Sequence, residues 1–151
     1  MTTTSASPAH APTTQPALNG QIIGQAERST RAVLERLLAE SGTPFHQWVT
    51  LNLLGGAPHS EPELVEHLSS GLLIGRAAAQ AAVDAARSAG LIVGVDDVVF
   101  TATGQDRFDA ITAGIAGITK RLYSDLPHED LVIARRVLES LTERARAALA
   151  A

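Results

Sequence analysis

The fold is decided by residues 60–104, which read SEPELVEHLSSGLLIGRAAAQAAVDAARSAGLIVGVDDVVFTATG. The stretch opens with a strong helix start, because Ser60 is a capping residue, Pro62 lies in the first turn and Glu63 follows three positions after the cap. Apolar residues at helical spacing follow, until Ser69-Ser70-Gly71 predicts a turn. The first part of the stretch therefore predicts one short amphipathic helix.

The second part predicts another helix and a hairpin. An alanine-rich helix is expected from about Leu72 to Gly90, where a glycine can adopt the left-handed conformation of a C-terminal cap. The spacing of apolar residues then changes to that of strands, with one β-rich run over 91–95 and another over 98–101. Between them lies Asp96-Asp97, a polar two-residue centre. Two short helices followed by a β-hairpin are therefore predicted.

Two more helices are predicted before this stretch. Apolar residues recur at helical spacing from Leu18 until Gly42 stops them, which predicts a long first helix over about 18–40. Thr43 and Pro44 then supply the cap and the first position of a second helix, which ends at a pair of glycines.

Two long helices are predicted after the hairpin. Gly104 opens the first, and the second begins at about His128 and extends to about residue 150. Both carry apolar side chains at alternating spacings of three and four, which leaves more apolar surface than one small domain can cover. A second copy of the chain is the natural cover, so we expect a homodimer. Its interface is predicted to consist of Leu18, Ile22, Ile23, Leu122, Leu131, Leu138 and Leu141.

This order of elements resembles the MarR family of transcriptional regulators across residues 18–150. The stretches that carry the resemblance are Val83-Asp84 followed by Ser88-Ala89-Gly90-Leu91-Ile92, then Phe100-Thr101-Ala102-Thr103-Gly104, and finally Leu126-Pro127-His128-Glu129-Asp130-Leu131. The resemblance implies a mainly α fold with a small β-hairpin wing, namely a winged helix-turn-helix domain over 18–151 with dimerisation helices at about 18–40 and 104–150. It also implies a dimer that binds double-stranded DNA through two recognition helices in successive major grooves, and a space near the dimer helices that responds to a small ligand.

The predicted recognition helix offers four candidate DNA contacts. Arg76 can pair with guanine, Gln80 can pair with adenine, and an alanine methyl such as that of Ala77 can contact the methyl group of thymine. Arg87 is the second arginine of the helix.

The charge of this region argues against tight DNA binding. Residues 60–104 contain two arginines against six acidic residues, and the rest of the chain is balanced. Asp96-Asp97 places two of the acids at the wing tip, where they repel phosphate. Two functions therefore stay open: a DNA-binding regulator, and a winged-helix protein that does not bind DNA but partners or antagonises another regulator.

The second helix carries candidate ligand contacts. His46, Trp48 and Asn52 can bind an aromatic or phenolic ligand, because in the family that helix lines the ligand-responsive space. The competing interpretation places Trp48 in the hydrophobic core, since it shares an apolar stripe with Phe45.

No metal, other cofactor or enzymatic activity is predicted. His59, Glu63 and His67 stand four residues apart, a spacing that can bring zinc ligands together. His59 precedes the helix cap, however, and histidines beside glutamate are common on protein surfaces. The sequence also lacks a phosphate-binding glycine loop, a nucleophile elbow and a paired-carboxylate motif.

Composition limits the cellular setting. The 151-residue chain has no cysteine, 45% apolar residues and 19% charged residues, as expected of one globular domain in a reducing compartment. It has no apolar run long enough to cross a membrane and no signal peptide, so we expect a cytoplasmic protein that makes no membrane contact. Residues 1–17 lack a periodic apolar face and are expected to form a disordered tail.

Overall fold

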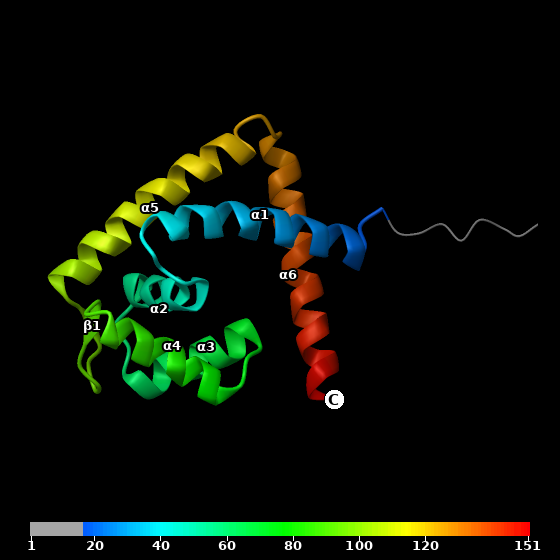
Figure 1. Cartoon of the computed structure of the whole chain (residues 1–151). Helices are drawn as coiled ribbons and strands as arrows, with labels where there is room; N and C mark the ends of the chain where they lie inside the picture. The colour runs from blue at the N-terminus through cyan, green and yellow to red at the C-terminus, as the bar shows by residue number, and fades with distance from the viewer. Residues whose placement is uncertain (1–16) are drawn as a thin grey trace, which may run out of the picture.

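The computed structural model describes residues 17–151 and contains six helices and one β-hairpin in that range (Figure 1). In chain order they are α1 (Gly20–Glu40), α2 (Phe45–Gly56), α3 (Glu61–Leu72), α4 (Arg76–Ser88), β1 (Ile92–Val93), β2 (Val99–Phe100), α5 (Ala102–Tyr123) and α6 (His128–Ala150). The winged helix-turn-helix fold predicted from the sequence is confirmed. The predicted tail lies outside the described residues, apart from Ala17.

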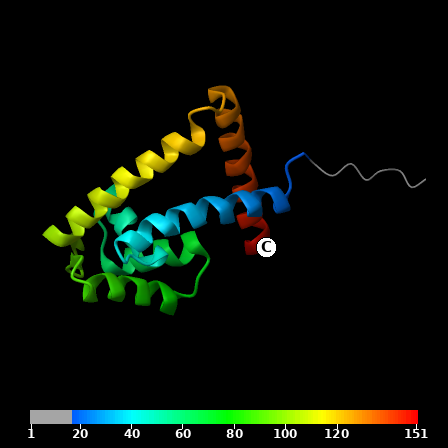
Figure 2. The ribbon, with the colours of Figure 1, turned by 45° about the horizontal axis from the view of Figure 1, so that its top comes forward.

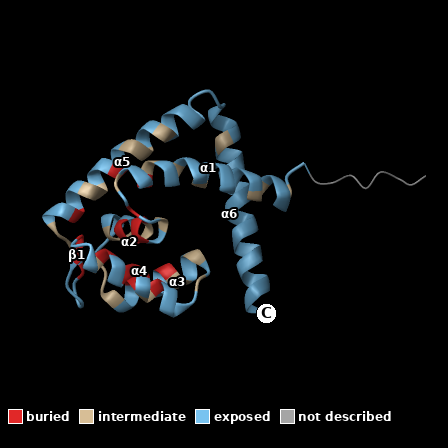
Figure 3. Ribbon diagram, viewed as in Figure 1, coloured by how far each residue is buried: buried red, intermediate tan, exposed pale blue. Residues whose placement is uncertain are grey.

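The hydrophobic core lies between α2, α3 and α4 and the parts of α1 and α5 nearest to them (Figure 3). Leu51, Leu64 and Leu68 are fully buried there, and each contributes roughly 1.5–3 kcal/mol by leaving water. The face that α4 turns to this core is made of small residues, namely Ala79, Ala82, Val83 and Ala86. Because these side chains are short, α4 packs on α2 and on α3 at once.

The turn between α3 and α4 lies later than the sequence predicts. Ser69-Ser70-Gly71 belongs to the last turn of α3. Leu73 then takes the left-handed conformation, with φ at 52°, and the Ser69 hydroxyl donates to a carbonyl oxygen of the turn at 2.7 Å. Because these interactions hold α3 together to its end, α4 begins at Arg76 and not near Leu72.

The cap of α2 also differs from the prediction. Pro44, and not Thr43, is the residue that precedes the first helical position. The Thr43 side chain is buried. Its hydroxyl is hydrogen-bonded to that of Ser41 at 2.8 Å and accepts from the Arg107 guanidinium at 3.1 Å. Thr43 therefore connects the α1–α2 turn to α5 rather than capping α2.

Helix α5 begins at Ala102, before the Gly104 position predicted to open it. Thr101 caps it, since its hydroxyl accepts from the Gly104 N–H at 3.0 Å and donates to the Gly90 carbonyl at 2.6 Å. Gly104 is required for another reason. A Cβ added there would lie 1.8 Å from the Leu91 carbonyl oxygen, so the glycine allows α5 to approach the start of the hairpin.

The hairpin has shorter strands and a longer loop than predicted. β1 and β2 pair antiparallel, with Ile92 opposite Phe100. Residues 94–98 connect them in place of a two-residue turn. Gly94 takes φ at 93°, and a Cβ added to it would lie 2.1 Å from the Asp97 carbonyl oxygen. Only a glycine therefore fits where the loop folds back on itself.

The last two helices extend away from the core and meet at a corner remote from α4 and the hairpin (Figures 1 and 2). Within the described residues, α5 buries only Gly104 and Ile111, and α6 buries none. Figure 3 shows most of α6 as exposed. None of the helices within residues 17–151 combines the length and apolarity that a membrane span requires.

Replacing Gly104 with alanine is expected to destabilise the protein by at least about 2 kcal/mol, because the added Cβ meets a backbone carbonyl that cannot rotate away. Gly117→Ala is the matched control in the same helix. Nothing lies within 4 Å of the Cβ added at this position, so the change should stabilise the helix by about 0.5–1 kcal/mol. Urea unfolding followed by circular dichroism measures both. Equal effects at the two positions would contradict the close approach of α5.

Candidate nucleic-acid interface

Helix α4 lies beside the hairpin (Figure 1), and its outer face carries small residues. Ala77, Ala78 and Ala81 are exposed on it. The N-cap is Gly75, which supplies no side-chain hydrogen bond to the first turn. The first backbone N–H groups of α4 are therefore open to an anion such as a phosphate group.

Arg76 is the first residue of α4, and its side chain extends into solvent. Its Nη1 atom lies 3.5 Å from Oε2 of Glu66, and both side chains are 67% exposed. A pair so long and so open contributes little to stability, because water and salt screen it. Arg76 is therefore available to contact a base or a phosphate.

Gln80 and Arg87, in contrast, are held by the carboxylate of Glu61. Gln80 Nε2 donates to Glu61 Oε1 at 2.7 Å and to Asp84 Oδ1 at 3.1 Å. Arg87 Nη2 donates to Glu61 Oε2 and also to the Gly94 carbonyl, the latter at 3.0 Å. Two of the four predicted DNA contacts are thus engaged in bonds within the chain.

Glu61 joins α3, α4 and the hairpin. Its backbone N–H donates to the Val95 carbonyl at 2.8 Å, and its side chain is only 18% exposed. The hydrogen bond from Gln80, followed by that from Arg87, holds the pKa of Glu61 below its usual range against the opposing effect of burial. Sequence reasoning missed this role, because the two partners stand 19 and 26 positions away and no local motif signals them.

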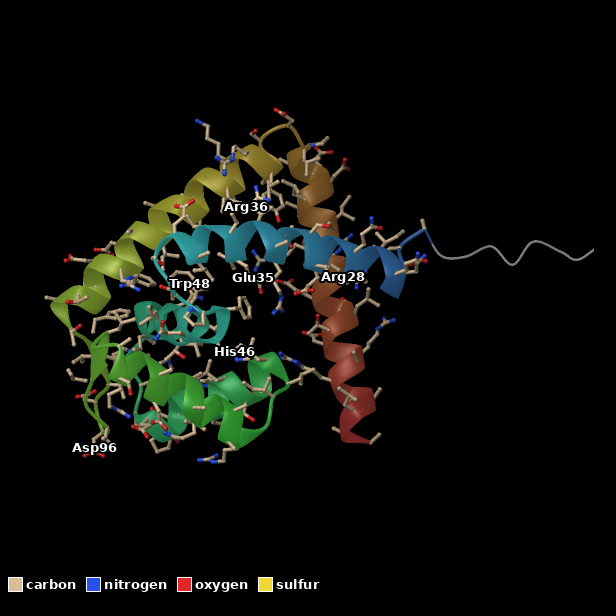
Figure 4. All side chains as sticks on the ribbon, in the orientation of Figure 1. Arg28, Glu35, Arg36, His46, Trp48 and Asp96 are labelled. Atoms are coloured by element: carbon tan, nitrogen blue, oxygen red, sulfur yellow. The ribbon has the colours of Figure 1, made fainter. Side chains whose placement is uncertain are left out.

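The wing has an acidic tip and an apolar face. Asp96 lies at the tip (Figure 4), and Asp97 beside it is also exposed. Val93, Val95 and Val99 are 49%, 57% and 51% exposed, and Val93 lies directly opposite Val99. Neither carboxylates nor valines attract phosphate, so the wing adds no electrostatic affinity for DNA.

Comparison with known proteins identifies the fold. No family model matches the sequence, and no curated protein matches it. Ligand-free NadR is 19% identical, with a TM-score of 0.70 over 85% of this chain and 99% of its own. Rv2887, a MarR-family protein of Mycobacterium tuberculosis solved in complex with DNA, is 20% identical, with a TM-score of 0.65 over 83% and 98%. MarR of Staphylococcus aureus, in complex with salicylate and kanamycin, is 12% identical, with a TM-score of 0.71 over 84% and 89%. This chain has the MarR-family winged-helix fold.

In this MarR-family fold, most of the residues predicted to form a dimer interface are exposed within residues 17–151. Leu18, Ile22, Leu122, Leu138 and Leu141 are 38–46% exposed, and Ile23 and Leu131 are partly buried. A groove of about 800 Å³ lies between the end of α5 and α6, with Tyr123, Leu131 and Leu138 among its lining residues.

The three predicted ligand contacts do not share one pocket. Trp48 is 5% exposed and stacks on Phe108 with ring centroids 5.8 Å apart, so it is a core residue. Asn52 is exposed and lines a shallow hollow between α2 and α3. His46 is exposed as well, with its ring 5.9 Å from that of Phe45. Of the three, His46 is the one that is both exposed and next to an aromatic ring, that of Phe45 at the start of α2.

The histidines near α3 do not form a metal centre. The rings of His59 and His67 are 4.9 Å apart. Glu63 accepts from the N–H and the hydroxyl of Ser60 at 2.8 and 2.9 Å, which completes the predicted capping box. These bonds, the backbone one first, lower the pKa of Glu63. Within residues 17–151, no three metal-ligating side chains come together.

The stability supplied by Glu61 should depend on pH. Its pKa is lowered in the folded state, so the stabilisation is present above the pKa of an unfolded glutamate, about 4.3. It is lost as the pH falls through the lower folded value. The free energy of unfolding of the wild type should exceed that of Glu61→Gln by about 1 kcal/mol at pH 7, and by little once Glu61 is protonated in the native protein.

Urea unfolding across this pH range measures the difference. Glu66→Gln is the control, since its pair with Arg76 is exposed and long. A difference for Glu61→Gln that stays constant with pH would show that the carboxylate is not its cause.

Proposed function

We propose that this protein is a homodimeric DNA-binding transcriptional regulator whose α4 enters the major groove. One observation carries the proposal: α4 has an unobstructed outer face beside the hairpin, and Arg76 at its first position is exposed and only loosely paired. The major groove admits an α-helix, and an arginine at its edge can bond guanine with two hydrogen bonds. The similarity in fold to Rv2887, which is solved with DNA, supports this reading.

The surface of α6 supports the dimer. None of its residues is buried within the chain, although Ile133, Val137, Leu138 and Leu141 are large and apolar. At 100° per residue, Ile133, Val137, Leu141, Leu138 and Leu131 fall within roughly 160° of the helix circumference, and Val132 lies outside this arc. A second copy packed around a two-fold axis would cover such a stripe, together with the exposed ends of α1 and α5.

A small aromatic or phenolic effector completes the proposal. The Arg31 guanidinium lies 4.2 Å over the ring of Phe45, and the ring of His46 is next to it. A cation and two aromatic rings thus gather where α1 meets α2. Arg31 Nε already donates to Glu27 Oε1 at 2.5 Å, so an aromatic carboxylate would pair with the other two guanidinium nitrogens and lie against the exposed ring of His46. The complex of Staphylococcus aureus MarR with salicylate supports this choice of ligand class.

A second function is favoured by the acidic residues of the head, the part of the molecule that consists of α3, α4 and the hairpin. Glu61 and Asp84 occupy Gln80 and Arg87, and Asp96 stands at the wing tip. A module that contacts the basic surface of another regulator would use the exposed carboxylates of Asp96 and Asp97 directly, whereas a DNA-binding protein must overcome their repulsion of phosphate.

Arg76→Ala is expected to weaken binding to specific DNA by about 1–3 kcal/mol without loss of fold, because it removes a base contact made by an exposed side chain. Arg121→Ala is the control. It removes the same charge from an exposed position at the far end of α5 and should change affinity little. Fluorescence anisotropy at two salt concentrations, on genomic fragments enriched by the wild type, measures both. If the wild type binds no host fragment even at low salt, DNA binding is wrong and the protein-contact function takes its place.

Leu138→Glu is expected to convert the dimer to a monomer, because it places a charge within the apolar stripe of α6. Light scattering at micromolar concentration should give twice the 15.8 kDa of the chain for the wild type and a single chain for the variant. Leu73→Glu makes the same chemical change at a leucine that is 72% exposed in the α3–α4 turn, and it should stay dimeric. A monomeric wild type, or an unchanged Leu138→Glu, would refute this interface.

A further inference from the structure

We propose that Glu61 is a positioning residue that withholds Gln80 and Arg87 from DNA, so that base reading by α4 falls to Arg76. This inference rests on the proposed DNA-binding function. It concerns which side chains of α4 can read a sequence, and not whether α4 enters the groove.

The amide of Gln80 has no donor to spare. A glutamine side chain carries two N–H donors on one nitrogen. Both lie within reach of carboxylates, at 2.7 Å from Glu61 and 3.1 Å from Asp84. Recognition of adenine requires that nitrogen to donate to N7 while the amide oxygen accepts from N6. Gln80 cannot do so until it leaves Glu61 or Asp84.

Arg87 is held on several sides. Its Nη2 atom donates to Glu61 and to the Gly94 carbonyl, and its Nη1 atom lies 3.5 Å from Asp84. Pairing with guanine takes two donors from one edge of the guanidinium. Each such edge includes Nη2, whose two N–H groups already bond Glu61 in α3 and Gly94 in the wing, so Arg87 fastens the wing to α4.

Glu61 is held in place more firmly than Glu66. Each of its two oxygens accepts from a different side chain, and its N–H is bonded to Val95. It is the first residue of α3, where the helix dipole favours a negative charge. Its side chain is 18% exposed, against 67% for Glu66 beside Arg76. Solvent therefore screens the Glu61 contacts far less than the Arg76 pair.

The test compares base preference, which a purely structural role would not change. Wild type, Glu61→Gln and Asp96→Asn select duplexes from a randomised pool, and anisotropy titrations then measure each single-base variant. Asp96→Asn removes the same charge near the DNA but breaks no contact with Gln80 or Arg87. We expect Glu61→Gln to gain at least about fivefold discrimination at one base pair to which the wild type is indifferent, and Asp96→Asn to gain only sequence-independent affinity.

A double substitution identifies the side chain that is released. Gln80→Ala should leave the wild-type preference unchanged, whereas adding Gln80→Ala to Glu61→Gln should reduce or abolish the new preference. Thermal melting confirms that each variant is folded at the assay temperature. If the wild type binds DNA and Glu61→Gln shows only the behaviour of Asp96→Asn, this inference is wrong and the proposed function stands. If neither the wild type nor any variant binds DNA, both are wrong.

Discussion

The bonds made by Glu61 hold together the half of the molecule that contains α3, α4 and the wing. Strands of two residues each are too short to be stable by themselves, so the position of the wing depends on bonds to the rest of the chain. The Glu61 N–H on Val95 and the Arg87 guanidinium on Gly94 supply two of them. The same Glu61 carboxylate bonds Arg87. Helix, turn and wing are therefore coupled through one partly buried ion pair, and the exposed pairs elsewhere on the surface have no comparable role.

The last helix differs from the core in how little of its surface is buried. The core between α2, α3 and α4 is closed, with Leu51, Leu64 and Leu68 fully buried, whereas α6 buries nothing. A helix needs an apolar face packed against something to be stable in water. Within residues 17–151, α6 has no buried residue, and the second copy of the proposed dimer would supply the missing surface. The core between α2, α3 and α4 is thus covered by the chain itself, whereas α6 is covered only in the proposed dimer.

Local signals in the sequence predicted most of the fold, because caps and periodicity act over a few residues. The Ser60–Glu63 capping box and the left-handed Gly90 are where they were expected. Two signals that contain glycine were interpreted wrongly. Ser69-Ser70-Gly71 lies inside α3 and does not end it. Gly104 does not open α5 but allows the helix to approach the Leu91 carbonyl, a contact that arises only in the folded chain. In the candidate site, too, local features could be predicted and contacts between distant elements could not. The sequence singled out Arg76 as a DNA contact although it placed the helix start near Leu72, whereas the engagement of Gln80 and Arg87 depends on residues in other elements.

Under the proposed function, the acidic head makes recognition of DNA depend less on attraction to phosphate and more on the spacing of the two α4 helices in the dimer. Two arginines stand against six acidic residues within 60–104, so one head alone gains little affinity from the release of counterions. A dimer presents two heads at a fixed spacing, and binding of the first raises the effective concentration of the second. Low charge also weakens competition from the excess of non-specific DNA, which is bound through phosphate contacts. A DNA site with two half-sites at the right spacing then binds the dimer more tightly than a site with only one half-site. In the proposed dimer, the helices that join the two chains therefore contribute to DNA recognition by setting the spacing of the two α4 helices.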